Sequence, residues 1–360
     1  MSAAMLCTSV AYAQDTLKIA FVGPRTGALT QYGDMVKEGL DTAIEELNAA
    51  GGINGKKIEL VVEDDACDPK QGAPTANRVV SAGIGYVVGH VCSGATIAAA
   101  DIYDEEGVVM ITPSATSPAL TDDKKRTTIF RTIGRDDQQG PAAVAYIVKH
   151  GGKKVAVLHD KQAYGLGVAT GVKEGLEKAG IAVALFEGIN AGESDYSAIV
   201  TKIKSEGVDY IYYGGYHPEF GLIARQARER GVDAKMISDE GTANAELVQI
   251  AGPASEGLMM TVPKDFSGDP ANAEVVKHFK DAGRDPGGAF QLSAYTAVLA
   301  IRDGIAKAGT EDPVKVAEAL RTIKVKSPLG EIGFNEKGDL TDFSFVVVKV
   351  NKDGSRSEAE

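Results

Sequence analysis

The sequence predicts an α/β protein made of two doubly wound lobes, each with a parallel sheet covered by helices. Apolar, strand-like runs alternate with amphipathic helical stretches along most of the 360 residues, a pattern typical of parallel sheets. The alternation restarts after the polar segment 134–141. The chain therefore divides into two α/β units of similar size.

The first unit opens with a strand over 17–23, followed by a helix over 35–52. Apolar residues recur at helical spacing in the second segment, and Gly51 and Gly52 end it. The pattern then repeats, with strands expected at 56–64, 85–89, 107–111 and 129–134 and helices expected at 71–82 and 94–106.

The second unit follows the same alternation. Its strands are expected at 153–160, 180–188, 208–215, 234–240 and 256–262, and its helices at 140–150, 165–179, 195–207 and 218–231. Two further helices, over 270–283 and 289–309, precede a segment at 330–350 that the pattern predicts to be a β-hairpin.

Composition argues against several classes of function. With 44% hydrophobic residues the chain can bury a large core, and its length suits two domains. The 50 acidic and 38 basic residues give a net charge of −12 without a cluster of Lys or Arg, so no nucleic-acid partner is expected. After the first residues, no stretch reaches the roughly 20 apolar residues of a membrane span.

The N-terminus resembles a signal peptide. Residues 1–13 are uncharged and fairly apolar, and they end in the small-x-small pattern Ala11-Tyr12-Ala13, so we expect cleavage after Ala13. A basic region is missing and the apolar run is short, which suggests a start codon upstream of Met1. The alternative is a frayed cytosolic N-terminus. Cys7 lies in a poor context for lipidation, because Met and Leu stand where small residues are preferred.

Two cysteines remain after such cleavage, Cys67 and Cys92. In an exported protein they predict one disulfide, and the alternative is two unpaired buried thiols. Neither cysteine lies in a CxxC motif and the five histidines lack metal-ligand spacing, so no metal site is predicted.

Signatures of enzymes are missing where such a fold would carry them. The glycines of 51–57 have the wrong spacing for a phosphate-binding loop, and those of 164–171 miss the dinucleotide spacing by one residue. No Gly-x-Ser-x-Gly elbow occurs, and the pair His159 and Asp160 ends a strand. We therefore predict no catalytic residue and no cofactor.

Small hydroxyl residues follow two neighbouring strands of the first unit. Ser93 and Gly94 open a helix, and the segment 112–118 supplies further hydroxyls in a turn. Ligands of open α/β sheets bind at the carboxyl ends of strands. A helix N-terminus with a Ser hydroxyl can hold a carboxylate without Lys or Arg. The alternative is that Ser93 is an ordinary N-cap.

The second unit offers an aromatic residue and an acid at similar junctions. Tyr216 lies at a strand-to-helix turn within 212–220, and Glu240 lies at another within 238–244. A carboxylate in such a turn can balance an ammonium ion. Taken singly, Tyr216 could be a surface aromatic, and Glu240 could be an acid in the first turn of a helix.

Several segments resemble the periplasmic branched-chain amino acid binding proteins of bacterial ABC transporters. The likeness covers nearly the whole mature chain. It rests on "AAGGINGKKIELVVEDDACDPKQ", "YVVGHVCSGAT", "DIYDEEGVVMITPSATSP", "VLHDKQAYGLG", "YIYYGGYHPE" and "FNEKGDLTDFSF", in this order. The resemblance implies a type I periplasmic binding protein fold, in which two lobes joined by three hinge crossings close over the ligand.

The resemblance also implies roles for single residues. Ser93 and the Thr116 backbone would hold the ligand α-carboxylate, and the Ser114 carbonyl and the Thr116 hydroxyl would take the α-ammonium. Tyr216 and Glu240 of the second lobe would meet the carboxylate and the ammonium, respectively.

An apolar pocket for the ligand side chain would be lined by Tyr32, Tyr164 and Phe290. The sequence departs from the family pattern at Arg25, where relatives usually carry a neutral residue, and at Gly94, where a second Ser is common. These two differences bear on which ligand is preferred.

The implied lobes are discontinuous in sequence. After the signal peptide at 1–13, the first lobe would comprise 14–134 and 264–342, the second 135–263 and 343–360, with hinges near 134–137, 262–265 and 340–344.

The implied function is that of an extracytoplasmic, monomeric receptor in the periplasm. It would capture a branched-chain or related aliphatic amino acid and deliver it to a membrane ABC permease. A competing interpretation is the ligand-sensing domain of a receptor, although neither a DNA-binding nor a membrane segment is found. An enzyme on the same fold would need a nucleophile, metal site or cofactor loop, and none is recognised.

Overall fold

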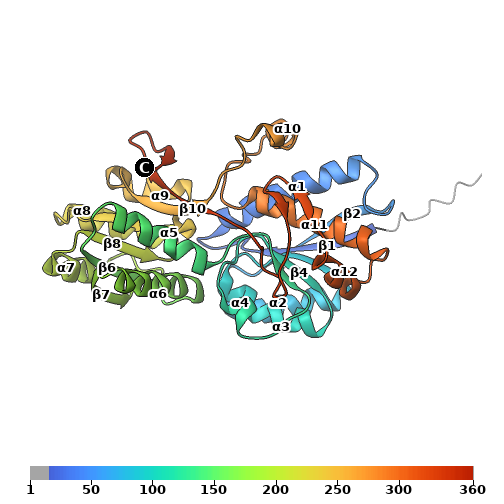
Figure 1. Cartoon of the computed structure of the whole chain (residues 1–360), viewed down its shortest axis with the longest axis horizontal. Helices are drawn as coiled ribbons and strands as arrows, with labels where there is room; N and C mark the ends of the chain where they lie inside the picture. The colour runs from blue at the N-terminus through green and yellow to red at the C-terminus, as the bar shows by residue number, and fades with distance from the viewer. Residues whose placement is uncertain (1–15, 360) are drawn as a thin grey trace, which may run out of the picture.

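The computed structural model describes residues 16–359 and shows two α/β lobes side by side (Figure 1). In the first lobe a sheet of five parallel strands is formed by β1 (Thr16–Gly23), β2 (Lys57–Asp64), β3 (Tyr86–Gly89), β4 (Val109–Thr112) and β5 (Ile129–Arg131). The lobe's helices are α1 (Thr30–Ala49), α2 (Pro69–Ser81), α3 (Ser93–Glu105), α4 (Ala119–Asp122), α10 (Ala273–Asp281), α11 (Gln291–Ala308) and α12 (Pro313–Leu320).

The second lobe is built around a seven-stranded sheet. Five parallel strands are β6 (Lys154–His159), β7 (Ala182–Gly188), β8 (Tyr210–Gly214), β9 (Lys235–Ser238) and β10 (Met259–Pro263). The helices are α5 (Asp136–Lys149), α6 (Ala163–Lys178), α7 (Ser197–Glu206), α8 (His217–Glu229) and α9 (Ala245–Ala251), with the 3-10 turns η1 (Glu240–Thr242) and η2 (Gly252–Ser255). A third turn, η3 (Pro270–Asn272), precedes α10.

Both lobes have the same strand order, and this order determines where a crevice can form at the edge of each sheet. The sheets run β2-β1-β3-β4-β5 and β7-β6-β8-β9-β10, so in each lobe the second strand lies outside the first and the order reverses between the first and third strands. Such switch points leave a crevice at the carboxyl ends of the strands. The predicted fold of two doubly wound lobes is confirmed.

The predicted C-terminal hairpin at 330–350 is wrong. Its two halves lie in different sheets: β12 (Gly330–Ile332) pairs with β11 (Val325–Ser327), whereas β13 (Phe345–Val350) pairs with β10 and with β14 (Arg356–Glu358). Alternating polar and apolar residues reveal a half-buried strand but not its partner. β13 and β14 extend the second sheet as an antiparallel edge.

Three short helices escaped the sequence analysis: α4, which spans only four residues, α9 and α12. α12 begins with Asp312, which caps the helix by accepting from the amides of Val314 and Lys315, and with Pro313 in its first turn. This pair of residues is a recognised start signal. α9 spans only seven residues, too few for a helical period to stand out.

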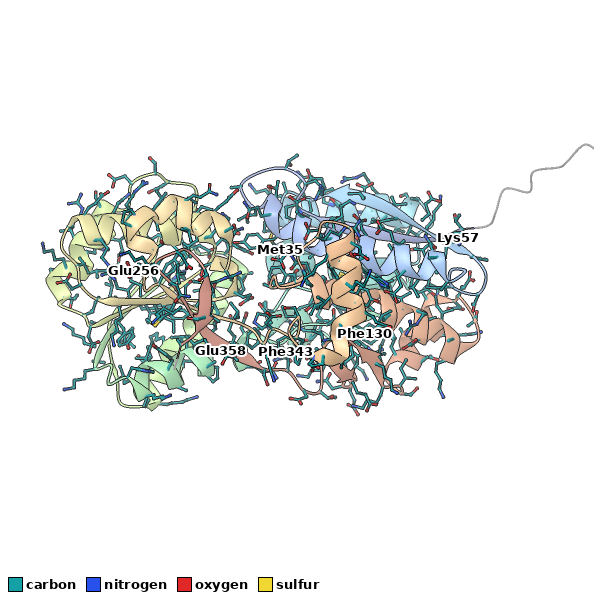
Figure 2. All side chains as sticks on the ribbon, turned by 90° about the horizontal axis from the view of Figure 1, so that it is seen from above. Met35, Lys57, Phe130, Glu256, Phe343 and Glu358 are labelled. Atoms are coloured by element: carbon teal, nitrogen blue, oxygen red, sulfur yellow. A yellow bond between two sulfur atoms is a disulfide. The ribbon has the colours of Figure 1, made fainter. Side chains whose placement is uncertain are left out.

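The chain passes between the two sheets three times, through 132–135, 264–269 and 333–344. Figure 2 shows Phe343 between the lobes. A Cβ on Gly134 would come within 2.5 Å of the Phe343 ring, so only glycine fits there. Asp339 of the third crossing joins Arg135 of the first at 2.8 Å. Within residues 16–359, no helix combines the length and the apolar character needed to cross a membrane.

Candidate ligand-binding site

The first lobe brings its predicted residues to the carboxyl ends of neighbouring strands. Ser93 is the first residue of α3, four positions after β3, and Ser114 and Thr116 follow β4. Tyr32 lies in the first turn of α1, which follows β1. Because the order reverses between β1 and β3, these loops meet at the switch point.

The second lobe contributes from the equivalent positions. Tyr164 lies in the first turn of α6 after β6, Tyr216 is the N-cap of α8 after β8, and Glu240 begins η1 after β9. Phe290 has a different origin, since it is the N-cap of α11 in the first lobe.

These residues surround one narrow cavity between the lobes, with a volume of about 20 Å³. This volume is far below the range of about 300–1,000 Å³ typical of ligand pockets, so the walls nearly touch and the lobes must part to admit a ligand. Its walls are formed by Tyr32, Val91, Cys92, Ser93, Ser114, Tyr164, Tyr216, Glu240, Gly241 and Phe290.

Seven of the eight predicted site residues therefore line the cavity, and Thr116 does not. The Thr116 hydroxyl lies 3.5 Å from Glu240 Oε1 and is fully buried, so it adjoins the cavity at Glu240. Sequence reasoning missed Val91, Cys92 and Gly241 as wall residues. A Cβ on Gly241 would come within 2.5 Å of the Gly215 carbonyl oxygen, so a side chain does not fit there. A glycine directly after Glu240 was the one sequence signal that could have indicated this wall residue.

Ser93 occupies the start of α3 without capping it. The N-cap is Cys92, while Ser93 Oγ accepts a long bond of 3.4 Å from the Ser117 amide. The first amides of a helix have no partner within the helix and carry partial positive charge. The start of α3 can therefore receive an anionic group, with the Ser93 hydroxyl as a further donor.

Glu240 is an acid buried without a complete set of partners. Its side chain belongs to a residue that is 2% exposed, and no hydrogen bond reaches Oε2 from any residue the structure describes. Burial, and then the negative charge of Asp136, raises the pKa of Glu240 to about 8. An ammonium group placed here would satisfy Oε2 and favour the ionised carboxylate.

Aromatic rings supply the apolar part of the wall. The ring centroid of Tyr32 lies 5.8 Å from that of Tyr216 and 6.1 Å from that of Phe290, and Tyr164 lies 5.5 Å from Tyr216. These spacings are those of packed, tilted aromatic pairs. The cavity thus combines an anion-binding side, an acid and an apolar wall.

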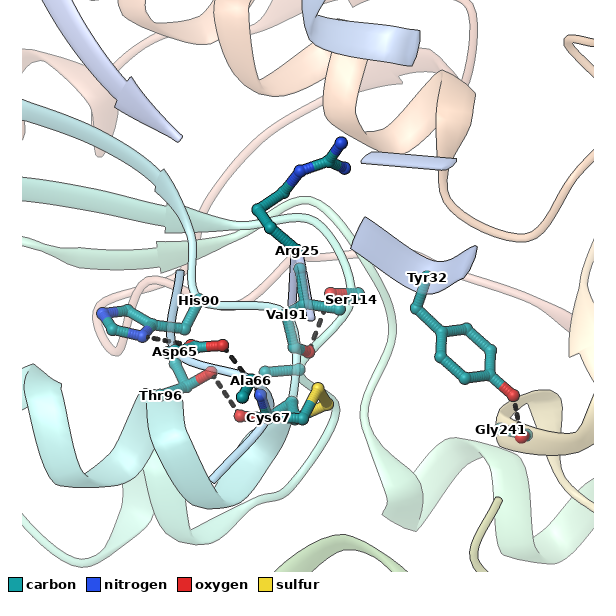
Figure 3. The surroundings of a disulfide bond; sticks show 12 residues. Arg25, Tyr32, Asp65, Ala66, Cys67, His90, Val91, Thr96, Ser114 and Gly241 are labelled. Carbon is teal, nitrogen blue, oxygen red and sulfur yellow. Dashed lines mark hydrogen bonds and ion pairs between the residues drawn. A yellow bond between two sulfur atoms is a disulfide. The ribbon is translucent and has the colours of Figure 1, made fainter. Parts of the chain in front are cut away.

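The predicted disulfide between Cys67 and Cys92 is confirmed, with Cα atoms 5.3 Å apart (Figure 3). The bond ties the loop after β2 to the residue that precedes Ser93. Asp65 supports the same loop by accepting from the Cys67 amide at 2.9 Å and by contacting His90 Nδ1 at 2.7 Å. The turn that precedes Ser93 is therefore covalently fixed.

Arg25 does not line the cavity. Its guanidinium pairs with Asp34 at 2.5 Å, and its amide donates to Asp64 at 2.8 Å. In Figure 3 its side chain extends away from Ser114. The charge of Arg25 is therefore neutralised outside the cavity.

A larger hollow of about 420 Å³ lies beside the crossing segments and is lined partly by Lys264, Asp265 and Arg356. None of the eight predicted site residues borders it. The smaller inter-lobe cavity is the better candidate, because buried polar groups converge on it.

Residues 16–355 match the family model described as periplasmic binding protein. The chain belongs to the periplasmic binding protein family. It is 52% identical to the leucine-, isoleucine-, valine-, threonine-, and alanine-binding protein of Pseudomonas aeruginosa, over 98% of this chain and 94% of that protein. It is 43% identical to the Leu/Ile/Val-binding protein of Escherichia coli K12, over 99% of this chain and 96% of that protein.

A solved structure of a leucine binding protein from Thermotoga maritima agrees in fold, with a TM-score of 0.89 and 31% identity over 96% of this chain and 98% of that one. The resemblance found in the sequence is confirmed. The family consists of binding proteins, so this periplasmic binding protein is not an enzyme.

Proposed function

We propose that the protein captures leucine, isoleucine or valine between its lobes and delivers it to an ABC permease. One observation carries the proposal: Glu240 is a buried acid with an unpartnered oxygen among the described residues, and it faces a helix N-terminus and an aromatic wall across one small cavity. A zwitterion with an aliphatic tail needs these three features together.

The geometry suggests a role for each group. The α-carboxylate would lie against the amides at the start of α3 and the Ser93 hydroxyl, with Thr116 N–H and Tyr216 as further donors. The α-ammonium would lie between Glu240, the Thr116 hydroxyl and the Ser114 carbonyl. The aliphatic side chain would then contact the rings of the wall, which come from Tyr32, Tyr164 and Phe290.

Closure is part of this proposal. We expect the lobes to divide at 134/135, 263/264 and 342/343, and to rotate about hinges near 134–137, 262–265 and 340–344, because one ligand that touches both lobes favours hinge closure. We further propose a periplasmic monomer that meets a membrane permease. The leader at 1–13, cleaved after Ala13, falls outside the described residues.

Isothermal titration with a panel of amino acids tests the proposal, after unfolding and refolding the protein to remove bound ligand. Leucine, isoleucine and valine should bind tightly and without turnover. Alanine and threonine test the breadth suggested by the name of the Pseudomonas relative. Clear binding of a sugar or a dicarboxylate, with no heat from any branched-chain amino acid, would refute the proposal.

A further inference from the structure

Tyr32 of the first lobe makes direct hydrogen bonds to residues of the second lobe. It belongs to α1 of the first lobe and is 1% exposed. Its hydroxyl donates to the Gly241 carbonyl at 2.5 Å and lies 2.6 Å from His217 Nδ1. Gly241 and His217 both belong to the second lobe, in η1 and α8. Figure 3 shows the Tyr32 side chain reaching toward Gly241.

The hydrogen-bond roles of His217 follow from its other contact. His217 Nε2 lies 3.0 Å from Glu246 Oε2 on α9. A carboxylate only accepts, so Nε2 carries the hydrogen. Burial lowers the pKa of His217 although Glu246 raises it, which favours the neutral ring. Nδ1 is then an acceptor, fixed in place by Glu246.

Tyr32 is the matching donor. Burial, reinforced by the negative charges of Asp239 and Glu219, raises its pKa well above the ordinary value, so the hydroxyl keeps its proton. The single hydroxyl proton of Tyr32 is therefore shared between two acceptors of the second lobe, Gly241 O and His217 Nδ1, in a three-centre hydrogen bond. Neither contact can exist unless the lobes are together.

We propose that Tyr32, His217 and Glu246 form an inter-lobe latch, which holds the closed cleft through hydrogen bonds that bypass the ligand. His217 and Glu246 are positioning residues, since neither lines the cavity. The latch rests on the proposed binding of the ligand between the lobes. Because it forms only after closure, it slows ligand release and leaves the encounter rate unchanged.

Stopped-flow kinetics with leucine on the mature protein test the latch. Tyr32→Phe keeps the ring contacts and removes the donor, and His217→Leu removes the acceptor. A hydrogen bond contributes about 0.5–1.5 kcal/mol net, so each variant should release leucine about 3- to 10-fold faster with an unchanged association rate. The double variant should release it no faster than Tyr32→Phe alone, because that substitution already removes the donor of both contacts.

Two control variants separate the latch from general destabilisation. Tyr86→Phe removes a buried hydroxyl that donates to Glu311 within the first lobe at 2.8 Å, and it should leave release unchanged. His217→Asn places an amide oxygen, which can accept a hydrogen bond, near the position of Nδ1. This variant should therefore release leucine more slowly than His217→Leu. Nitrogen chemical shifts of His217 should report the neutral Nε2–H form in the leucine complex.

The outcomes distinguish the latch from the ligand site. Wild-type release rates in Tyr32→Phe, or additive effects in the double variant, would overturn the latch. If Glu240→Ala binds leucine as tightly as the wild type while Tyr32→Phe releases it faster, the ammonium site is wrong and the latch stands. Faster release in Tyr86→Phe to the same extent would also overturn the latch.

Discussion

The two halves of the cleft differ in charge and in how far their polar groups are satisfied. The first-lobe half is neutral, and the hydroxyls of Ser114 and of Thr112 already have partners, whereas that of Ser93 has only the long contact from the Ser117 amide. Ser114 Oγ donates to the Val91 carbonyl at 2.8 Å, and Thr112 Oγ1 donates to the His90 carbonyl at 2.8 Å. With the disulfide behind it, this half is a fixed set of donors.

The second-lobe half is acidic and incomplete. Glu240, Asp239 and Asp160 each keep one buried carboxylate oxygen to which no described residue donates. Burial raises the pKa of all three, to about 7 for Asp160 and to about 8 for Glu240. Buried groups of this kind are costly until a partner arrives. In the proposed complex, the first lobe therefore contributes hydrogen-bond donors in fixed positions. The second lobe contributes a carboxylate that pairs with the ammonium group of the ligand.

Removing the charge should have the largest effect on affinity. Loss of one partner from a buried ion pair costs about 3–5 kcal/mol, so we expect Glu240→Ala to weaken leucine binding on the order of 100- to 5,000-fold. Unfolding without ligand should change little, since an open cleft solvates the acid. Calorimetry and a melting curve measure both quantities.

Glu219→Ala is the matched control for Glu240→Ala. Glu219 is also a buried acid of the second lobe, but it accepts from the Gly192 amide and does not line the cavity. This variant should bind leucine nearly as well as the wild type. Near-normal affinity in Glu240→Ala would place the ammonium elsewhere.

Removing the covalent support of the first-lobe half should act mainly on stability. The Cys67–Cys92 bond closes a sequence separation of 25 residues, and such a crosslink stabilises by about 3 kcal/mol. We expect a Cys67→Ser, Cys92→Ser variant to lose about this much in urea unfolding, with a smaller loss of affinity. Unchanged stability would show that the noncovalent contacts of Asp65 suffice.

Removing one donor of the first-lobe half should cost less than removing the charge. A hydrogen bond to a charged group contributes about 1.5–3 kcal/mol, and the amides of α3 remain, so Ser93→Ala should weaken leucine binding about tenfold. Thr96→Val is the control, because it removes a neighbouring hydroxyl that bonds the Cys92 carbonyl instead of facing the cavity. Equal losses in both variants would indicate damage to the helix.

The predictable part of the site follows strand order. Ser93, Ser114, Tyr164, Tyr216 and Glu240 all stand shortly after a strand, and carboxyl ends of parallel strands meet at one edge. The sequence therefore located both halves of the cleft. The neutral and acidic characters of the two halves were also visible, as hydroxyls in 112–118 and as an acid in 238–244.

The rest depends on contacts that no local pattern encodes. The latch joins Tyr32 to His217 across 185 positions of sequence, and no sequence pattern singled out His217. The partner strand of β13 could not be predicted. Alternation of polar and apolar residues shows which face of a strand is buried, but it does not show which strand lies beside it. Arg25 suggested a change of ligand, yet Asp34 holds it outside the cavity.

The smallest expected effect is a dependence of ligand-free closure on pH, which tests the acidic half alone. With the lobes together, burial and then the negative charge of Asp136 raise the pKa of Glu240 from its ordinary value of 4.5 to about 8, and we expect the ordinary value in an open, solvated cleft. A group with a higher pKa in the closed form favours that form below pH 4.5, and the preference disappears as pH rises toward 8. Small-angle scattering should therefore give a smaller radius of gyration for the ligand-free protein at pH 5 than at pH 9.

Glu240→Gln decides whether this acid causes the dependence. The amide does not titrate, so the difference in radius between pH 5 and pH 9 should shrink. Burial also raises the pKa of Asp136, to about 7, which acts in the same direction and should leave a residual difference. A wild-type radius that is equal at both pH values, or a full difference in Glu240→Gln, would show that the incomplete half of the cleft does not govern closure through Glu240.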